Sequence, residues 1–260
     1  MEEADETIVG IHAVAEALAG GEQVRSVIVG ERRRGDASLK DLIAQAKQRG
    51  VPVQTQPESW FQRFRHARHQ HVAARVARFE HAFWPSVRAR LAAKTDALVV
   101  IADHIEDPQN LGAIMRAVEA AGGDALVIPD RRSASVTAAT RRAAAGAASH
   151  LPIVAVPNIV RIIEDLKEDG HWVNGLTTAR GARAYTEVDF RGKCTLVVGS
   201  EGSGLGRLVS ERCDNLIAIP MLGKVASLNA AAAAAVVLYE AVRQRRQGLV
   251  KTGTSRPGNP

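Results

Sequence analysis

The chain of 260 residues has few cysteines, few aromatic residues and no long apolar run. Its two cysteines, Cys194 and Cys213, form no C-x-x-C pair, so we expect reduced thiols rather than disulfides or a structural zinc site. No run of about 18 apolar residues is present, which argues against a transmembrane helix. The acidic residues 1–6 lack the apolar segment of a signal peptide. The sequence therefore predicts a soluble cytoplasmic protein with no membrane partner and no metal.

Positive charge is concentrated in one part of the chain. Between Phe61 and Lys94 there are eight Lys or Arg residues and a single acid, Glu80, a net charge of +7, whereas the whole chain carries +6. Six aromatic residues lie in or beside this stretch: Trp60, Phe61, Phe64, Phe79, Phe83 and Trp84. Cations interleaved with aromatic rings suit the phosphates and unstacked bases of RNA. The alternative that composition leaves open is a solvated, arginine-rich surface and linker.

Hydrophobic periodicity divides the chain into four parts: a small α/β domain over 7–80, a basic linker over 81–95, a larger domain over 96–247 and a disordered tail over 248–260. The first part has strand patterns at 24–29, 51–55 and 72–76. Apolar runs that alternate mostly with helical patterns predict six strands in the larger domain: 97–102, 125–129, 153–156, 172–176, 195–199 and 216–219. This order predicts an α/β fold with a doubly wound, largely parallel sheet.

Polar clusters follow three of the strands, at the sheet edge where open parallel sheets bind ligands. In the first cluster, Asp107 and Pro108 fit the N-cap and first position of a helix. If the apolar residues of this helix are buried, Asn110 lies at the mouth of the crevice and Arg116 on one flank. A capped helix with a surface arginine is the alternative interpretation.

The second cluster, residues 199–206, contains four glycines and a lone Glu201. Glycine lets the backbone approach a ligand closely, and an acid in such a loop favours a site over a simple tight turn. No Gly-Lys-Ser/Thr follows, so this is not a Walker loop. The glycine spacing also differs from that of a dinucleotide fingerprint, and no serine stands at a nucleophile elbow.

The third cluster runs from Pro220 to Asn229 and precedes six alanines, residues 230–235. We predict a helix over 227–246 with Ser227 as its N-cap. Asn229 would then lie in the apolar first turn, where its amide needs polar partners. A ligand or another polar cluster would supply these partners, and a local capping network is the alternative.

Together the clusters resemble the three motifs of the SpoU (TrmH/RlmB-like) RNA 2′-O-methyltransferases. They read Asp-Pro-x-Asn-x-Gly-x-x-x-Arg at 107–116, Gly-x-Glu-Gly-x-Gly at 199–204 and Ile-Pro-Met-x-Gly-x-x-x-Ser-Leu-Asn at 219–229. Residues 8–18 resemble the start of the family's substrate-binding domain, which is similar to the ribosomal L30e/L7Ae fold. The resemblance covers about residues 7–246, and it is strongest to the RlmB-type branch, which methylates a guanosine ribose of 23S rRNA.

The resemblance implies a C-terminal domain with a SPOUT-type trefoil knot, which general topology rules would not predict, and a homodimer. S-adenosyl-L-methionine would be the methyl donor, held by Gly199, Gly202, Ile219, Met221 and Leu228. The reaction site would consist of Asn110, Arg116, Glu201, Ser227 and Asn229, with Arg116 meeting a site completed by the partner subunit. RNA, in this branch 23S rRNA, would be the substrate. DNA would be inert because the reaction needs a ribose 2′-OH.

Two positions depart from the family pattern: His71 stands where many relatives have glycine, and Ala231 replaces a serine. A guanidinium is a poor base at neutral pH, so we expect Arg116 to orient RNA rather than abstract a proton. One rival interpretation is a tRNA ribose methyltransferase, although the simpler tRNA enzymes of the family carry short basic extensions in place of an N-terminal domain. A non-catalytic rRNA-binding protein is the other rival, and the intact polar residues argue against it.

Overall fold

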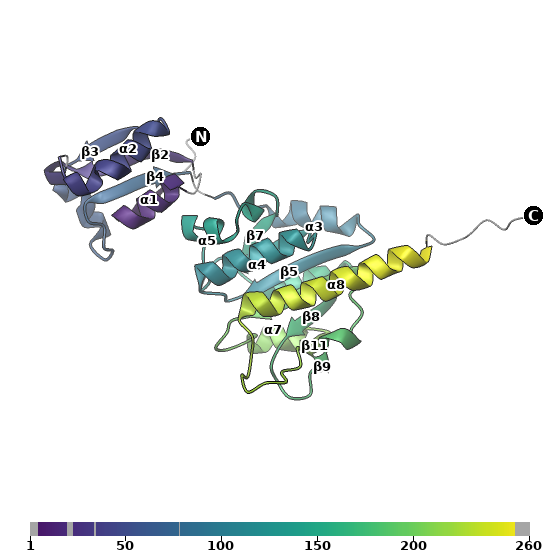
Figure 1. The fold of residues 1–260 in the computed structure, drawn as a ribbon. Helices are drawn as coiled ribbons and strands as arrows, with labels where there is room; N and C mark the ends of the chain where they lie inside the picture. Colours follow the sequence, from purple (N-terminus) through teal and green to yellow (C-terminus); the bar gives the residue numbers. More distant parts are fainter. Residues whose placement is uncertain (1–4, 20–22, 34, 78, 253–260) are drawn as a thin grey trace, which may run out of the picture. The chain divides into compact units, whose positions relative to one another are not determined.

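The computed structural model describes residues 5–19, 23–33, 35–77 and 79–252, which divide into two compact units (Figure 1). The N-terminal unit comprises Met1–Glu80 together with Val136–Arg142. The C-terminal unit comprises His81–Ser135 and Ala143–Pro260. Each unit has its own sheet and its own apolar core. No helix in the described ranges is long and apolar enough to cross a membrane.

The N-terminal unit is built on a four-stranded sheet in the order β1-β4-β2-β3. Its strands are β1 (Glu6–Val9), β2 (Val24–Gly30), β3 (Val53–Gln56) and β4 (Val72–Val76). β4 is antiparallel to β1 and β2, whereas β3 runs parallel to β2. Helices α1 (Ile11–Ala19) and α2 (Lys40–Gln48) bury their apolar residues against one face. The short helix η3 (Glu58–Phe64) covers the other face, where Phe61 packs on Ile28 and Ala73. Two further short helices, η1 (Glu31–Arg33) and η2 (Ala37–Leu39), connect β2 to α2.

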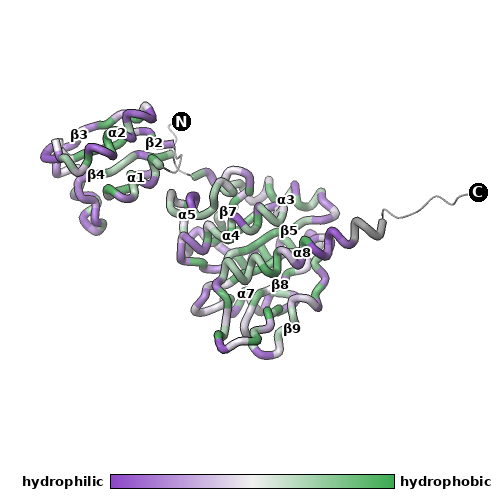
Figure 2. The backbone as a smooth tube through the Cα atoms, viewed as in Figure 1, coloured by the Kyte–Doolittle hydropathy of each residue, from purple (hydrophilic) through white to green (hydrophobic). Residues whose placement is uncertain are grey.

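The C-terminal unit is built on a seven-stranded sheet in the order β7-β6-β5-β10-β8-β11-β9, and every pair in it is parallel. The strands are β5 (Ala97–Asp103), β6 (Ala125–Pro129), β7 (Ile153–Val156), β8 (Trp172–Leu176), β9 (Arg183–Ala184), β10 (Lys193–Gly199) and β11 (Asn215–Ala218). β5 is buried along its whole length, and the tube in Figure 2 is correspondingly green there. The predicted α/β fold with a parallel sheet is confirmed.

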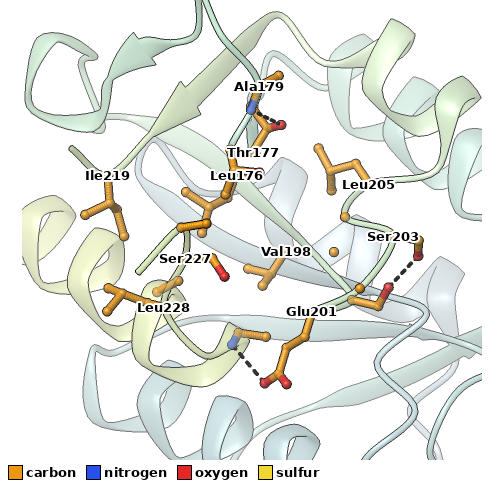
Figure 3. Close-up of a pocket in the computed structure, with 18 of the residues that line it drawn as sticks. Leu176, Thr177, Ala179, Val198, Glu201, Ser203, Leu205, Ile219, Ser227 and Leu228 are labelled. Atoms are coloured by element: carbon orange, nitrogen blue, oxygen red, sulfur yellow. Dashed lines mark hydrogen bonds between the residues drawn. The ribbon is translucent and has the colours of Figure 1, made fainter. Parts of the chain in front are cut away.

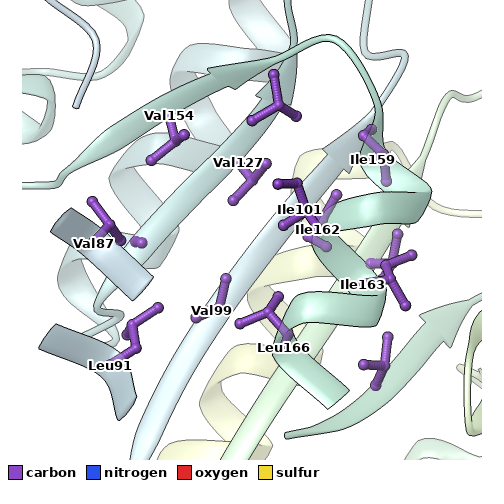
Figure 4. Close-up of a cluster of buried hydrophobic side chains, with 14 of the residues drawn as sticks. Val87, Leu91, Val99, Ile101, Val127, Val154, Ile159, Ile162, Ile163 and Leu166 are labelled. Atoms are coloured by element: carbon purple, nitrogen blue, oxygen red, sulfur yellow. The ribbon is translucent and has the colours of Figure 1, made fainter. Parts of the chain in front are cut away.

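Helices cover both faces of this sheet. On one face, α3 (Trp84–Ala92), α6 (Ile159–Glu168) and α7 (Arg207–Arg212) share a core with alternate residues of the central strands (Figure 4). On the other face, α4 (Pro108–Ala120) and α8 (Ala230–Thr252) lie side by side (Figure 1). The remaining short helices are α5 (Ala138–Ala143), η4 (Ala147–Ser149) and η5 (Tyr185–Glu187). Because α4 and α8 begin just after β5 and just beyond β11, their N-termini come to the carboxyl edge of the sheet.

The structure corrects two of the expected boundaries. The segment 81–95, expected as a linker, contains helix α3, whose Val87 and Leu91 are buried in the core. Arg88 on this helix forms ion pairs with Asp165 and Asp169, so part of the local positive charge is neutralised within the unit. The predicted disordered tail 248–260 is also partly wrong, because α8 continues to Thr252, and residues 253–260 lie outside the described ranges.

Candidate active site

The candidate site lies at the carboxyl edge of the larger sheet, where β5 and β10 are in register and Asp103 stands opposite Gly199. The three motifs follow β5, β10 and β11, and residues 177–179 follow β8. Parallel strands bring all four segments to the same edge, so residues more than 100 positions apart meet there. The topology therefore explains why the three sequence clusters form one site.

The glycine loop after β10 folds back on itself. Ser200 and Gly204 form a β-bridge, with the Gly204 amide donating to the Ser200 carbonyl at 2.9 Å. A Cβ at position 199 would lie 2.3 Å from the Gly204 carbonyl carbon, so only glycine fits there. Gly204 adopts a positive φ of 66°, which also favours glycine. The Ser200 and Ser203 hydroxyls are 2.6 Å apart and close the loop further (Figure 3).

A buried carboxylate that sequence reasoning missed anchors this loop. Asp103 closes β5, and its side chain is 1% exposed. One oxygen accepts a hydrogen bond from the Gly206 amide at 2.8 Å, and the other lies 2.5 Å from His104 Nδ1. The only signal in the sequence is a single acid at the end of a wholly apolar strand. Asp103 thus ties the end of the glycine loop to the end of the neighbouring strand.

Asn110, Glu201 and Asn229 form a hydrogen-bonded triangle, although they come from three different motifs. Asn110 Nδ2 donates to Glu201 Oε1 at 2.8 Å, and Asn229 Nδ2 donates to the same oxygen at 2.6 Å. Asn229 Nδ2 also donates to Asn110 Oδ1 at 2.7 Å. The Ala230 amide adds a fourth contact, at 3.3 Å from Glu201 Oε1 (Figure 3). Glu201 therefore sits at the N-terminus of α8, where a helix favours negative charge.

The helix cap fixes the orientation of both amides. Asn229 Oδ1 accepts hydrogen bonds from the Ala231 and Ala232 amides, at 2.9 and 3.2 Å. Its nitrogen must then face Asn110 and Glu201, and Asn110 must present its own oxygen to that nitrogen. Asn229 is thus the N-cap, and the predicted cap at Ser227 is wrong because the helix begins three residues later, at Ala230. The capping network and the polar cluster, weighed as alternatives in the sequence, coexist in one side chain.

A cavity of about 360 Å³ lies beside this triangle. Its apolar wall includes Leu176, Val198 and Leu205, and backbone segments of the glycine loop and of the third motif complete it (Figure 3). All five residues predicted to hold a cofactor line the cavity: Gly199, Gly202, Ile219, Met221 and Leu228. Glu201 and Ser227 line it as well, whereas Asn110 and Asn229 reach it through their bonds to Glu201.

Residues 177–179, which no sequence motif pointed to, also line the cavity. Their position after β8 is the available signal, because β8 neighbours β10 in the sheet. A second hollow, of about 350 Å³, lies on the other side of the loop and is lined by residues 105–107, Asn110 and residues 200–203. Glu201 therefore borders both spaces.

Arg116 does not join the triangle. It lies on α4, six residues after Asn110, which corresponds to about 9 Å along the helix axis and about 240° around it. Leu111 and Met115 on the same helix are buried, whereas Arg116 is exposed. No ion pair or hydrogen bond joins its side chain to another residue in the described part of the chain. Within one chain, the guanidinium is therefore open to a partner.

Neither cysteine has the character of a catalytic nucleophile. Burial raises the pKa of Cys194 and that of Cys213 to about 12, so both thiols are protonated at neutral pH. Among the described residues, no group of three or more His, Cys, Asp or Glu side chains could hold a metal ion.

Two family models match this chain. The model described as the SpoU rRNA Methylase family matches residues 97–239, more than half of the chain and all three motifs. The chain belongs to the SpoU RNA methyltransferase family. A second model, described as RNA 2′-O ribose methyltransferase substrate binding, matches residues 7–82 and thus the N-terminal unit. The family resemblance of the sequence is confirmed, and the protein is an RNA methyltransferase of the SpoU family.

Relatives and solved structures agree with this assignment. A protein of Staphylococcus epidermidis named as a TrmH family tRNA/rRNA methyltransferase is 39% identical over 244 residues, which cover 94% of this chain and 97% of that protein. The SpoU methyltransferase AviRb from Streptomyces viridochromogenes, in complex with the cofactor AdoMet, is 26% identical with a TM-score of 0.61, covering 94% and 92% of the two chains. The TrmH/SpoU tRNA modifying enzyme of A. aeolicus is 28% identical with a TM-score of 0.55, but covers 66% of this chain and 87% of its own.

Proposed function

We propose that this protein transfers a methyl group from S-adenosyl-L-methionine to a ribose 2′-OH of RNA, with a guanosine of 23S rRNA as the target. The observation that carries the proposal is the triangle of Asn110, Glu201 and Asn229 at the edge of a cavity of about 360 Å³. A cavity of this size, lined by apolar side chains together with hydroxyl and carboxylate groups, is within the range of small-molecule sites.

The residues around the cavity suit an adenosine-containing donor. Val198, Leu205 and Ile219 offer apolar surface for a purine ring. The absence of a side chain at Gly199 keeps the backbone close, because a Cβ there would collide with the loop. We assign donor binding to Gly199, Gly202, Ile219, Met221 and Leu228, with the backbone as the main source of hydrogen bonds. S-adenosyl-L-methionine, when bound, would supply a methyl group that its sulfonium already activates.

The remaining task of the protein is to position the ribose, and the polar triangle is suited to it. Its members fix one another before any ligand arrives, which is the kind of preorganisation that lowers the cost of aligning two reactants. Glu201 borders both the donor cavity and the hollow of about 350 Å³ beside it, and we assign the acceptor nucleotide to that hollow. Ser227 would contribute its hydroxyl at the cavity wall.

Arg116 would bind an RNA phosphate and orient the nucleotide, since a guanidinium pairs well with phosphate oxygens. Because it faces away from its own triangle, we propose that it acts in the site of a partner subunit, in a homodimer. We also propose that the loops after β10 and β11 belong to the trefoil knot of the family. The mixed sheet with two helices on one face supports an L30e/L7Ae-like N-terminal unit.

Ribosomal rather than transfer RNA is favoured as the substrate by the extent of the matches. The A. aeolicus tRNA modifying enzyme covers only 66% of this chain. The N-terminal unit matches a separate family model, the one described as RNA 2′-O ribose methyltransferase substrate binding. The S. epidermidis relative is named for both RNAs, so tRNA is the alternative substrate to be tested.

The test offers the purified protein labelled S-adenosyl-L-methionine with a 23S rRNA transcript, a tRNA transcript pool and a DNA copy of the 23S sequence. We expect label on the ribose of a guanosine in the 23S transcript and none on DNA. Digestion to nucleosides separates ribose from base methylation. Label on a base, or none on any RNA, would contradict the proposed activity, and label on tRNA alone would replace the substrate.

A further inference from the structure

The charged surface of the N-terminal unit has a specific architecture that the catalytic proposal leaves unused. Three segments meet at one end of this unit: residues 30–33 after β2, η3, and the loop 65–71 that leads into β4. The Gly30 amide donates to the His71 carbonyl at 2.9 Å, and Arg33 Nη1 donates to the Gln70 carbonyl at 2.8 Å. We call this surface the arginine end.

The backbone of the arginine end is held firmly. Gln70 and His71 both adopt positive φ, at 48° and 54°, a conformation that favours glycine. His71 compensates by contacts of its side chain, which pairs with the Glu58 carboxylate and packs against His69, with ring centroids 4.6 Å apart. His69 in turn stacks on the buried Phe61 at 5.4 Å. The loop is therefore a preformed surface.

Two acids at or beside this end, Asp36 and Glu58, have local partners, and a third, Glu31, is exposed, whereas three arginines are exposed: Arg63, Arg65 and Arg68. Asp36 is hydrogen-bonded to Arg33 and Ser38, which lower the pKa of its carboxyl to about 2. Glu58 is occupied by His71 and by the Arg32 amide. Arg65 and Arg68 are exposed and have no carboxylate partner among the described residues. A surface with more exposed arginines than acids is the electrostatic footprint of a polyanion site.

One arginine is positioned for base recognition and not only for charge. The Arg63 guanidinium lies over the Trp60 ring, 4.6 Å from its centroid, and its Nε donates to the Trp60 carbonyl at 3.0 Å. Trp60 is itself fixed by edge contact with the buried Phe61 at 4.9 Å. Arg63 is exposed, so the stack presents a flat, oriented cation to solvent. Unstacked RNA bases bind to such guanidinium planes, whereas a paired duplex offers no free base face.

We infer that the arginine end binds unpaired nucleotides of the RNA substrate, with Arg63 on Trp60 stacking against a base and with Arg65 and Arg68 on flanking phosphates. The inference rests on the proposed function in taking RNA as the substrate. It adds the class of RNA element that the N-terminal unit selects, a single-stranded loop or bulge, and the residues that contact it.

The test measures binding of the full-length protein to a fluorescent RNA hairpin with a single-stranded loop and to the same stem as a blunt duplex. Arg65→Glu/Arg68→Glu should weaken hairpin binding about tenfold or more and flatten the dependence on log salt by roughly 0.7 per lost phosphate contact. Lys47→Glu/Arg49→Glu is the matched control, because it makes the same charge change at the opposite end of the unit, before β3 begins. The control should change affinity less than about twofold, as for charges not in contact.

Arg63→Lys separates stacking from charge, since it keeps the cation and removes the plane. We expect it to lose most of the preference for hairpin over duplex, by roughly fivefold or more. Equal loss in the two double variants would reduce the effect to net charge and overturn the inference. An unchanged hairpin preference in Arg63→Lys would overturn it too. Each variant should unfold at the same temperature as the wild type and bind the donor with the same affinity, which excludes misfolding.

The outcomes separate this inference from the proposed activity. Loop-dependent binding without any methyl transfer would leave the arginine end established and the activity refuted. Methyl transfer that is unaffected by substitution of Arg63, Arg65 and Arg68 would establish the activity and refute the role of the arginine end.

Discussion

The two units treat their polar side chains in opposite ways. In the C-terminal unit, Asn110, Glu201 and Asn229 bond to one another, and one oxygen of the carboxylate accepts three hydrogen bonds. In the N-terminal unit, Asp36 and Glu58 have local partners, and the exposed Arg65 and Arg68 of the loop have no carboxylate partner among the described residues. The first arrangement fixes a geometry, and the second leaves charge for a polyanion. A division of labour between chemistry and RNA capture follows, and the predictions below test it from its largest expected effect to its smallest.

Arg116 takes no part in the hydrogen-bonded triangle of the C-terminal unit, and its removal should have the largest effect. Arg116→Ala should reduce methyl transfer about a hundredfold or more, on the scale of one lost transition-state contact. Donor affinity should barely change, because the cavity is lined by other residues. Single-turnover rates and calorimetric titration with the donor measure the two quantities.

Mixed dimers test whether Arg116 acts across the subunit interface. If it does, Arg116→Ala combined with Asn229→Ala produces heterodimers with one intact site and partial activity. Heterodimers as inactive as both parents would instead put the two residues in the same subunit's site. Either parent mixed with wild-type protein serves as the control for subunit exchange.

The triangle itself can be separated from helix capping by Asn229→Asp. Aspartate caps a helix about as well as asparagine, so the first turn of α8 should persist. The change removes both amide donors and sets a second carboxylate beside Glu201, so methyl transfer should fall about ten- to a hundredfold, as for hydrogen bonds to a charged group. Asn229→Ala should lose both the cap and the triangle, and thus unfold at a lower temperature than Asn229→Asp. Equal activity of Asn229→Asp and wild type would show that only the cap matters.

One histidine of the C-terminal unit, His171, is buried, with Nδ1 3.1 Å from Thr195 Oγ1, whereas His66 of the N-terminal unit is exposed. Burial, with a smaller contribution from the neighbouring Lys193, lowers the pKa of His171 from 6.5 to about 4. Between these values the unfolded chain binds more protons than the folded one. The contribution of His171 to the free energy of unfolding is therefore fully present above about pH 6.5. It is lost as the pH falls toward 4, by about 3 kcal/mol in all.

Denaturant unfolding at pH 7.5 and pH 5 checks this expectation. The free energy of unfolding should fall in the wild type, and His171→Asn should flatten that fall. His150→Asn, a replacement of an exposed histidine in the same unit, controls for histidine content. A fall of the same size in His171→Asn would assign the acid sensitivity to other groups.

The smallest effect is expected at Ala231, where the family pattern leads us to expect serine. Its side chain is 9% exposed and lies in the first turn of α8, with its amide already bonded to Asn229. Ala231→Ser can place its hydroxyl against the helix backbone, so we expect less than about a threefold change in methyl transfer. A larger gain would mean that the hydroxyl reaches the reaction site, and steady-state rates distinguish the two outcomes.

Much of the larger sheet could be predicted from the sequence because buried parallel strands read as apolar runs. The expected strands 125–129, 153–156 and 172–176 coincide with β6, β7 and β8. Their order in the sheet could not be predicted, since β10 pairs with β5 through contacts between distant residues. Helix α3 was missed because only Val87 and Leu91 form its buried face among charged and small neighbours.

The candidate site divides in the same way. The three sequence motifs predicted Asn110, Glu201 and Asn229 as site residues, and the fold brings these residues within hydrogen-bond distance of one another. Asp103 and residues 177–179 carry no spacing pattern, because each contributes only through its place at a strand end. The cap at Ser227 was wrong because capping depends on where the backbone turns, and Asn229 meets that condition two residues later.

The packing of α4 against α8 has a consequence for how this site tolerates change. Asn110 lies in the first turn of α4, and Asn229 immediately precedes α8. The 2.7 Å hydrogen bond between them therefore depends on the distance between the two helices. Both helices carry buried small residues, among them Gly112 on α4 and Ala234 on α8. A close-packed interior converts added volume into displacement of whole elements. A larger side chain between α4 and α8 would therefore change the distance between Asn110 and Asn229. Residues that do not contact a ligand can thus alter the geometry of the reaction site.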